Sequence, residues 1–128
     1  MRAVARREPA RRRNLLIAAY CLPKDYYGKL AAFYQHKRDI IVNELAKVGF
    51  TPYLPKGPYY VLCDISAFGT ADDTGFANRM VEEIGVAAVP GSSFYFRREL
   101  GRNKIRFAFC KTEETLRAAI LRLEKLGR

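Results

Sequence analysis

The sequence predicts an α/β (α+β) fold, a two-layer sandwich in which helices pack on a small mixed β-sheet. Three observations lead to this prediction. A long segment has its apolar residues at helical spacing, two β-rich runs flank a turn rich in proline and glycine, and two further helical patterns enclose two more strand-like runs. With 128 residues, 49% of them hydrophobic, the chain is long enough for one domain with a single core.

The first helical pattern follows a short apolar run. Residues 14–22 form this run, Pro23 stops it, and it is interpreted either as the end of a helix or as a buried connector. From Asp25 onward apolar side chains recur every three or four residues, and Gly49 is placed to end the helix as a C-cap. We therefore predict a long helix between Asp25 and Gly49 with one apolar face.

A hairpin and another helix follow. Residues 50–54 and 59–64 are β-rich, and the Pro-Lys-Gly-Pro sequence at 55–58 is typical of a tight turn, so the two runs are predicted to pair. Residues 70–73 supply N-cap candidates for a helix that ends at Gly85. The apolar face of this helix is predicted to consist of Phe76, Met80, Val81 and Ile84.

The last part of the chain has two strands and a final helix. A short strand at 86–89 is expected to end at Pro90-Gly91, and an arginine-rich loop at 97–103 leads to a strand at 104–110. Thr112 is the predicted N-cap of the last helix, whose acidic first turn suits the helix dipole. Its apolar stripe is formed by Leu116, Ala119, Ile120, Leu123 and Leu126.

The positive charge of the chain is unevenly distributed. The formal net charge is +10, and residues 1–13 contain six arginines and one glutamate. We expect residues 1–13 to form a solvated, flexible basic arm and residues 14–128 to form the domain. Such an arm could also bind nucleic acid or anionic lipid, or act as a targeting segment, although it lacks the serines expected of one.

Neither the cysteines nor the histidine indicates a metal site. Cys21, Cys63 and Cys110 form no closely spaced pair, and His36, the only histidine, is predicted to face solvent. The odd number of cysteines, two of them in apolar strand-like runs, fits a reducing, cytoplasmic compartment. No apolar run approaches the roughly 20 residues needed to cross a bilayer, which argues against a membrane-spanning protein.

Arg106 is the most informative residue of the predicted sheet. Alternation along its strand places Ile105 and Phe107 on one face and Arg106 with Lys104 on the other. A guanidinium stays charged and is costly to bury without a partner, so Arg106 either faces solvent or binds an anion. Its planar fork suits a carboxylate, which it can bind through two parallel hydrogen bonds.

The order of the motifs around Arg106 resembles the C-terminal small domain of the class I/II aminotransferases, fold-type I enzymes that depend on pyridoxal phosphate. The resemblance covers residues 23–126 and rests first on Pro-Gly, two small residues and phenylalanine at 90–94, then on Arg-Phe-Ala-Phe at 106–109. Further matches, in the family's order, are Tyr26-Tyr27, Lys37-Arg38-Asp39, Gly49-Phe50, Pro55 with Gly57, and Tyr59-Tyr60. Pro58 departs from the small residue that usually follows that glycine.

The resemblance implies part of an enzyme that transfers an amino group between an amino acid and a 2-oxo acid. It implies that Arg106 binds the substrate's α-carboxylate and that Ser93 and Phe94 line the substrate pocket; the alternative is a turn residue and a core aromatic. The family's Schiff-base lysine lies in a serine-rich motif of the large domain, and no lysine here has that context: Lys24, Lys29, Lys37, Lys47, Lys56, Lys104, Lys111 and Lys125. We therefore expect the large cofactor-binding domain to be absent and the chain to contain no catalytic residue. The isolated chain is expected to be inactive and not to bind pyridoxal phosphate, the cofactor of the family.

Two other functions stay open at the level of the sequence. A basic α/β module could bind nucleic acid, and residues 106–109 resemble part of an RNA-recognition signature, although its glycine and its further aromatic are missing. A non-catalytic remnant would instead bind a separate large domain or a second copy of the chain. The apolar run at 15–22 favours self-association. Most members of a group of tyrosines are predicted to pack, at the face that would meet a large domain: Tyr20, Tyr26, Tyr27 and Tyr34.

Overall fold

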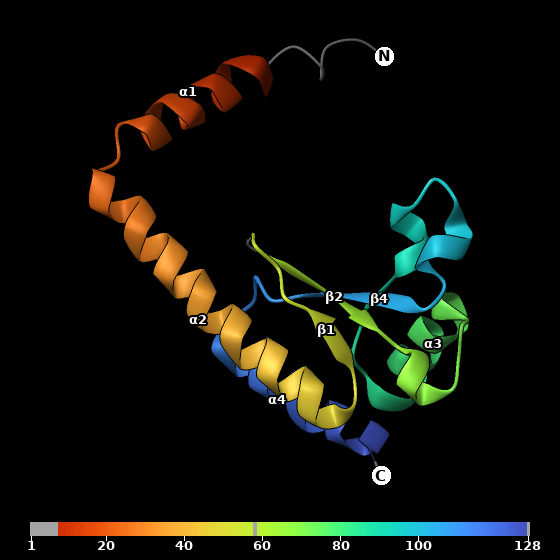
Figure 1. The fold of residues 1–128 in the computed structure, drawn as a ribbon. Coiled ribbons are helices and arrows are strands. Elements are labelled where there is room, and N and C mark those ends of the chain that lie inside the picture. The colour runs from red at the N-terminus through yellow and green to blue at the C-terminus, as the bar shows by residue number, and fades with distance from the viewer. Residues whose placement is uncertain (1–7, 58, 128) are drawn as a thin grey trace. The chain divides into compact units, whose positions relative to one another are not determined.

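An antiparallel sheet lies at the centre of the fold. The computed structural model describes residues 8–57 and 59–127. Strands β1 (Thr51–Tyr53), β2 (Tyr60–Asp64), β4 (Lys104–Ala108) and β3 (Val89–Pro90) lie side by side in the order β1-β2-β4-β3 (Figure 1). Every neighbouring pair is antiparallel, so the mixed sheet predicted from the sequence is wrong in this respect. The β1–β2 and β3–β4 pairs are each joined by a connection at one end, and such a connection makes neighbouring strands antiparallel.

The helices that complete the fold are α2 (Lys24–Val48), α3 (Asp73–Arg79) and α4 (Glu113–Leu123). Figure 1 shows α4 alongside the second half of α2. All three helices contribute side chains to one core on the inner face of the sheet. The predicted two-layer arrangement of helices on a sheet is confirmed.

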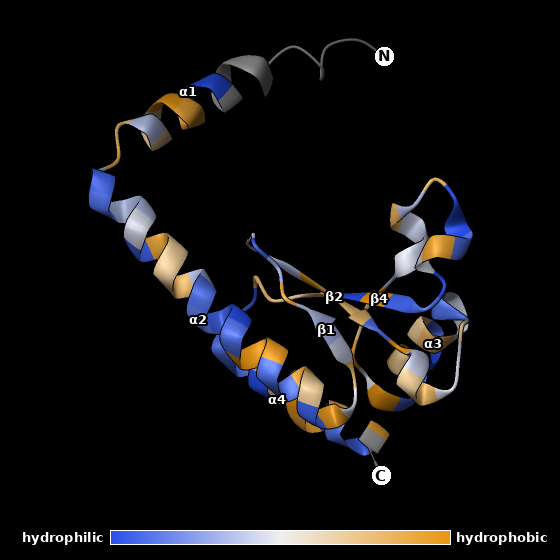
Figure 2. Cartoon of the chain, viewed as in Figure 1, coloured by the Kyte–Doolittle hydropathy of each residue, from blue (hydrophilic) through white to orange (hydrophobic). Residues whose placement is uncertain are grey.

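The chain divides between Ala32 and Phe33, inside α2, into two compact units. The first unit contains α1 (Glu8–Tyr20) and the start of α2. The apolar run that follows Asn14 is the end of this helix and not a buried connector: Leu15, Leu16 and Ile17 are 64, 62 and 56% exposed. Figure 2 colours this stretch of α1 orange.

The structure describes part of the predicted basic arm and part of the predicted turn at 55–58. Residues 1–7 of the predicted basic arm, like Pro58 of the predicted turn, lie outside the described residues, and residues 8–13 begin α1. Among the predicted packing tyrosines, only Tyr34, in the second unit, packs against the core, whereas Tyr20, Tyr26 and Tyr27 are exposed. None of the described helices is long and apolar enough to cross a membrane.

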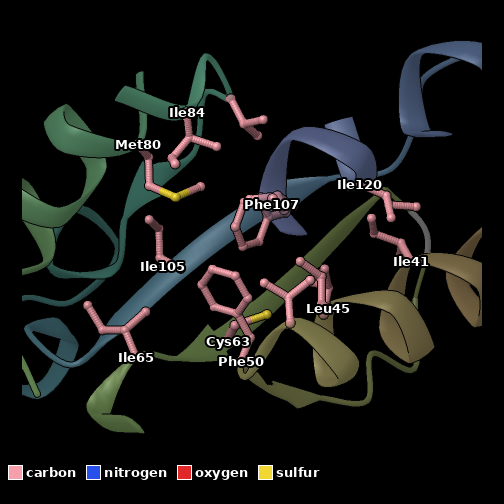
Figure 3. Packing of buried hydrophobic residues seen from close by; sticks show 14 of the residues in the cluster. Ile41, Leu45, Phe50, Cys63, Ile65, Met80, Ile84, Ile105, Phe107 and Ile120 are labelled. Carbon is pink, nitrogen blue, oxygen red and sulfur yellow. The ribbon is translucent and has the colours of Figure 1, made fainter. Parts of the chain in front are cut away.

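The core lies in the second unit and follows the predicted alternation (Figure 3). Ile105 and Phe107 of β4 and Val61 and Cys63 of β2 point inward, because partners in the antiparallel register share a face. The helices add Ile41 and Leu45 from α2, Phe76 and Ala77 from α3, and Leu116, Ile120 and Leu123 from α4. The predicted N-cap of the last helix is confirmed, since the Thr112 hydroxyl accepts a hydrogen bond from the Thr115 amide at 3.2 Å.

The helix predicted to end at Gly85 changes its winding. Asp72 caps α3, and after Arg79 the chain continues as a π-helical segment, Met80–Ile84, which ends at Gly85 with φ 73°. Because the i→i+5 turn is wider than an α-helical turn, Met80 and Ile84, four residues apart, both point toward the core, while Val81 points to solvent. Val81 is 52% exposed, so its predicted place on the apolar face is wrong; Ala77 is buried instead.

The observed strands are shorter than the strands predicted from the sequence. The strand predicted at 86–89 pairs only at Val89–Pro90, because the Val86 amide instead closes the preceding helix on the Met80 carbonyl. The strand predicted at 104–110 ends at Ala108, and the hairpin predicted from 50–54 and 59–64 is confirmed with a shorter first strand.

Candidate functional site

The face of the sheet opposite the core carries the candidate site. The register places Tyr53, Leu62, Arg106 and Val89 in one row across the four strands. On β2 and β4 the neighbours of Leu62 and Arg106 point into the core, so this row points away from it. A shallow pocket over the row is lined by Tyr53, Leu54, Pro55, Tyr60, Leu62, Phe94, Tyr95 and Arg106.

Two aromatic rings contact the Arg106 guanidinium. Its central carbon lies 4.1 Å from the centroid of the Tyr60 ring and 4.1 Å from that of the Phe94 ring. Tyr60 pairs with Ala108, two residues from Arg106 on the same strand, and such diagonal neighbours are within reach of long side chains. Cation–π contacts of this kind stabilise the charge and order the side chain without using its hydrogen-bond donors.

The donors of the Arg106 guanidinium have no protein partner within residues 8–57 and 59–127. The described ion pairs of arginine involve Arg38, Arg97 and Arg117, and none includes Arg106. The described hydrogen bonds from guanidinium groups likewise come from other arginines. Arg106 is therefore a half-buried cation with its fork available, the arrangement expected of an anion-binding residue.

The loop that presents Phe94 is held by close backbone packing. Residues Gly91–Phe94 form a 3₁₀ turn, and the buried Asp73 carboxylate accepts a hydrogen bond from the Ser92 amide at 2.6 Å. A Cβ on Gly101 would lie 2.5 Å from the Ser92 nitrogen, and a Cβ on Gly91 would lie 2.6 Å from the Gly101 oxygen. Both positions require glycine because no side chain fits between the two segments.

Of the three residues that the sequence analysis assigns to the site, two come together. Phe94 lies against Arg106 and is half-exposed, so it is not a core aromatic. Ser93 is exposed and does not line this pocket. The contact between Tyr60 and Arg106 was not predicted from the sequence. Pairing the predicted strands at 59–64 and 104–110 in their observed register would have indicated it, because it brings the two residues close together.

The other charged groups on this face are engaged with protein partners. Asp64 accepts hydrogen bonds from the Ser66 amide at 2.7 Å, from Asn103 at 2.6 Å and from the Tyr53 hydroxyl at 3.3 Å. Partial burial acts to raise the pKa of Asp64, but the bonds from Ser66 and Tyr53 and the charge of Lys104 outweigh it and hold the pKa below its ordinary value. Lys104 donates to the Leu100 carbonyl at 2.8 Å and to Asn103 at 2.9 Å.

The contact between Tyr53 and Asp64 shifts the pKa values of the two groups in opposite directions. Burial, followed by the negative charge of Asp64, raises the pKa of the Tyr53 hydroxyl. The raised pKa keeps the hydroxyl protonated, and donating to Asp64, further into the alkaline range than an ordinary tyrosine. Asp64 is thus satisfied locally and does not compete for the Arg106 fork.

The residues of this pocket fit a carboxylate and do not fit pyridoxal phosphate. No lysine is among the residues that line it, so it offers no amine for a Schiff base. The buried Lys37 amine is engaged elsewhere, donating to the Lys111 carbonyl and lying 4.1 Å from the Phe33 ring centroid. The apolar walls and single free guanidinium suit a small organic acid.

The histidine and the cysteines lie outside this site. The exposed His36 is 3.8 Å from Glu113, which confirms its predicted solvent-facing position. Cys63 is buried in β2, and burial raises the pKa of its thiol to about 12. No three His, Cys, Asp or Glu side chains of the described residues are grouped so that they could hold a metal ion.

Comparison with known proteins gives a consistent family match. The family model described as aminotransferase class I and II matches residues 14–123. Curated relatives include a kynurenine–oxoglutarate transaminase of Dictyostelium discoideum, 33% identical over 123 residues, and a methionine aminotransferase of Escherichia coli, 41% identical over 105 residues. Each match takes in 80% of this chain but only 28% and 26% of the relative, so the chain spans about a quarter of the relatives' length.

Solved structures agree with the sequence matches. The N-succinyldiaminopimelate aminotransferase of Mycobacterium tuberculosis superposes with a TM-score of 0.75 at 32% identity, over 80% of this chain and 27% of that one. The E. coli methionine aminotransferase superposes with a TM-score of 0.71 at 41% identity, over 79% of this chain and 26% of that one.

Proposed function

Because this chain belongs to the aminotransferase class I and II family, we propose that it forms the C-terminal small domain of a pyridoxal-phosphate-dependent transaminase. In this proposal Arg106 binds the α-carboxylate of the amino acid or 2-oxo acid substrate, and Phe94 lines the same pocket. The observation that supports it is the Arg106 fork, held on the sheet face opposite the core with no carboxylate partner among the described residues.

In such an enzyme the role of this chain is to bind the substrate's carboxylate and to orient the substrate. Transamination requires the bond that breaks at the substrate's α-carbon to be held in one direction relative to the cofactor. A carboxylate bound through both of its oxygens to Arg106 is fixed in position and in plane, so the α-carbon attached to it is fixed as well. Pyridoxal phosphate supplies the electron sink when bound, and its lysine belongs to the part of the enzyme outside this chain.

A carboxylate titration of the chain tests the Arg106 assignment. Pyruvate added to ¹⁵N-labelled protein should shift the Nε–Hε resonance of Arg106 in a saturable manner, because a carboxylate binds directly at this group. Arg106→Gln should abolish saturable binding, whereas Arg117→Gln, on the exposed side of α4, should leave it unchanged. Saturable pyruvate binding that survives Arg106→Gln would contradict the assignment.

A further inference from the structure

Two rings approach Arg106 from opposite sides of its strand. Tyr60 lies on β2 and Phe94 follows β3, and the strand order places β2 and β3 on the two sides of β4. Both ring centroids are 4.1 Å from the guanidinium carbon, and the aromatic pairs among the described residues do not include one between these two rings. The guanidinium therefore lies between the rings.

Coverage from both sides limits how a ligand can reach Arg106. The five N–H donors of a guanidinium lie in its plane, so the rings leave the donors at the edge free. At this edge a planar carboxylate matches the fork with two hydrogen bonds.

We propose that Tyr60 and Phe94 form an aromatic clamp that positions the Arg106 guanidinium for edge-on carboxylate binding; this inference rests on the proposed function of Arg106. In this proposal both rings act through the Arg106 guanidinium, which they contact, so both are positioning residues. An arginine side chain that is already ordered loses less conformational freedom when it binds, and the affinity for carboxylate is correspondingly higher. Both side chains are about half exposed, 44% for Tyr60 and 47% for Phe94, so their removal should leave the core intact.

The clamp is tested with Tyr60→Leu and Phe94→Leu, each compared with a conservative partner, Tyr60→Phe or Phe94→Tyr. In the wild-type chain without ligand, ring currents should shift the Arg106 side-chain protons upfield, and each leucine variant should lose part of that shift. The apparent Kd for pyruvate should rise about fivefold in each leucine variant, the size expected for one cation–π contact, and return to the wild-type value in the conservative variants. Phe96→Leu is the matched control, since Phe96 lies in the same loop but is fully exposed.

The outcomes separate the clamp from the function on which it rests. Wild-type pyruvate affinity in both leucine variants would overturn the clamp and leave the Arg106 assignment intact. A wild-type chain in which pyruvate does not shift the Arg106 resonance would contradict the proposed function itself. Equal weakening by Phe96→Leu would also overturn the clamp, because the effect would then belong to the loop as a whole.

Discussion

At the scale of single residues, charged side chains inside this fold are tolerated because each has a specific partner. Lys37 is buried beside the Lys111 carbonyl and the Phe33 ring, and Asp73 is buried against the Ser92 amide. No buried side-chain nitrogen or oxygen of the described residues lacks a hydrogen-bond partner. Arg106 differs from Lys37 and Asp73: aromatic rings contact it, yet its donors are unused, which makes it the residue suited to a ligand.

Asp73→Ala should lower the free energy of unfolding by about 1–3 kcal/mol, because it leaves the buried Ser92 amide without its acceptor. Urea unfolding followed by circular dichroism measures the change. Asp39→Ala is the control, since Asp39 forms an exposed ion pair with Arg38 that should contribute little. An equal decrease in the free energy of unfolding in the two variants would contradict the role given to Asp73.

The buried Cys63 thiol should make stability depend on alkaline pH. Burial raises the pKa of Cys63 from 9.0 to about 12, so between these values the unfolded chain loses the proton and the folded chain keeps it. The stabilisation is complete below pH 9.0 and is lost as the pH rises toward about 12. Urea unfolding should therefore give a lower free energy of unfolding at pH 10 than at pH 8. The Cys63→Ala variant should lack the part of this difference that comes from the thiol.

At the scale of elements, three helix ends were predictable from the sequence, whereas the ends of two strands were not. Gly49, Gly85 and Thr112 mark helix ends through local backbone chemistry, and each acts as predicted. Strand length depends instead on distant partners, as Val86 shows by bonding to the preceding helix. Alternation correctly predicted that Arg106 points away from the core, but it could not reveal Tyr60 and Phe94 beside it, since register and loop packing involve long-range contacts.

Gly101→Ala should destabilise the fold and displace the loop that carries Phe94. The new Cβ would lie 2.5 Å from the Ser92 nitrogen, and overpacking of this kind costs about 1–3 kcal/mol. Gly28→Ala, inside α2, has no atom within 4 Å of its Cβ and should instead stabilise the helix by about 0.5–1 kcal/mol. Thermal unfolding of the two variants compares them directly, and a neutral Gly101→Ala would show that the two loop segments separate easily.

At the scale of the whole molecule, several large apolar side chains lie exposed outside the core. The chain spans about a quarter of the length of its curated relatives, and Leu15, Leu16 and Ile17 of α1 are each more than half exposed. A run of consecutive exposed apolar residues favours contact with another protein surface. This surface is consistent with the proposal that the chain acts as one part of a larger enzyme.

The isolated chain should therefore self-associate. Sedimentation equilibrium should give an average mass that rises with concentration above the 14.6 kDa of one chain. Replacing Leu15, Leu16 and Ile17 by serine should reduce this rise, because it removes apolar surface without touching the core. A monomeric mass at high concentration in the wild-type chain would contradict the prediction.

The most direct measurement is the activity of a chimera in which this chain replaces the matching segment of the E. coli methionine aminotransferase, to which it is 41% identical over 105 residues. The chimera should transaminate, and Arg106→Gln within it should lower kcat/KM by about a hundredfold, mainly through KM, because two charge-assisted hydrogen bonds to the carboxylate are lost. The absorbance of bound pyridoxal phosphate should stay unchanged, and Arg117→Gln should have no effect. An active chimera whose kcat/KM is unaffected by Arg106→Gln would show that Arg106 does not bind the substrate carboxylate.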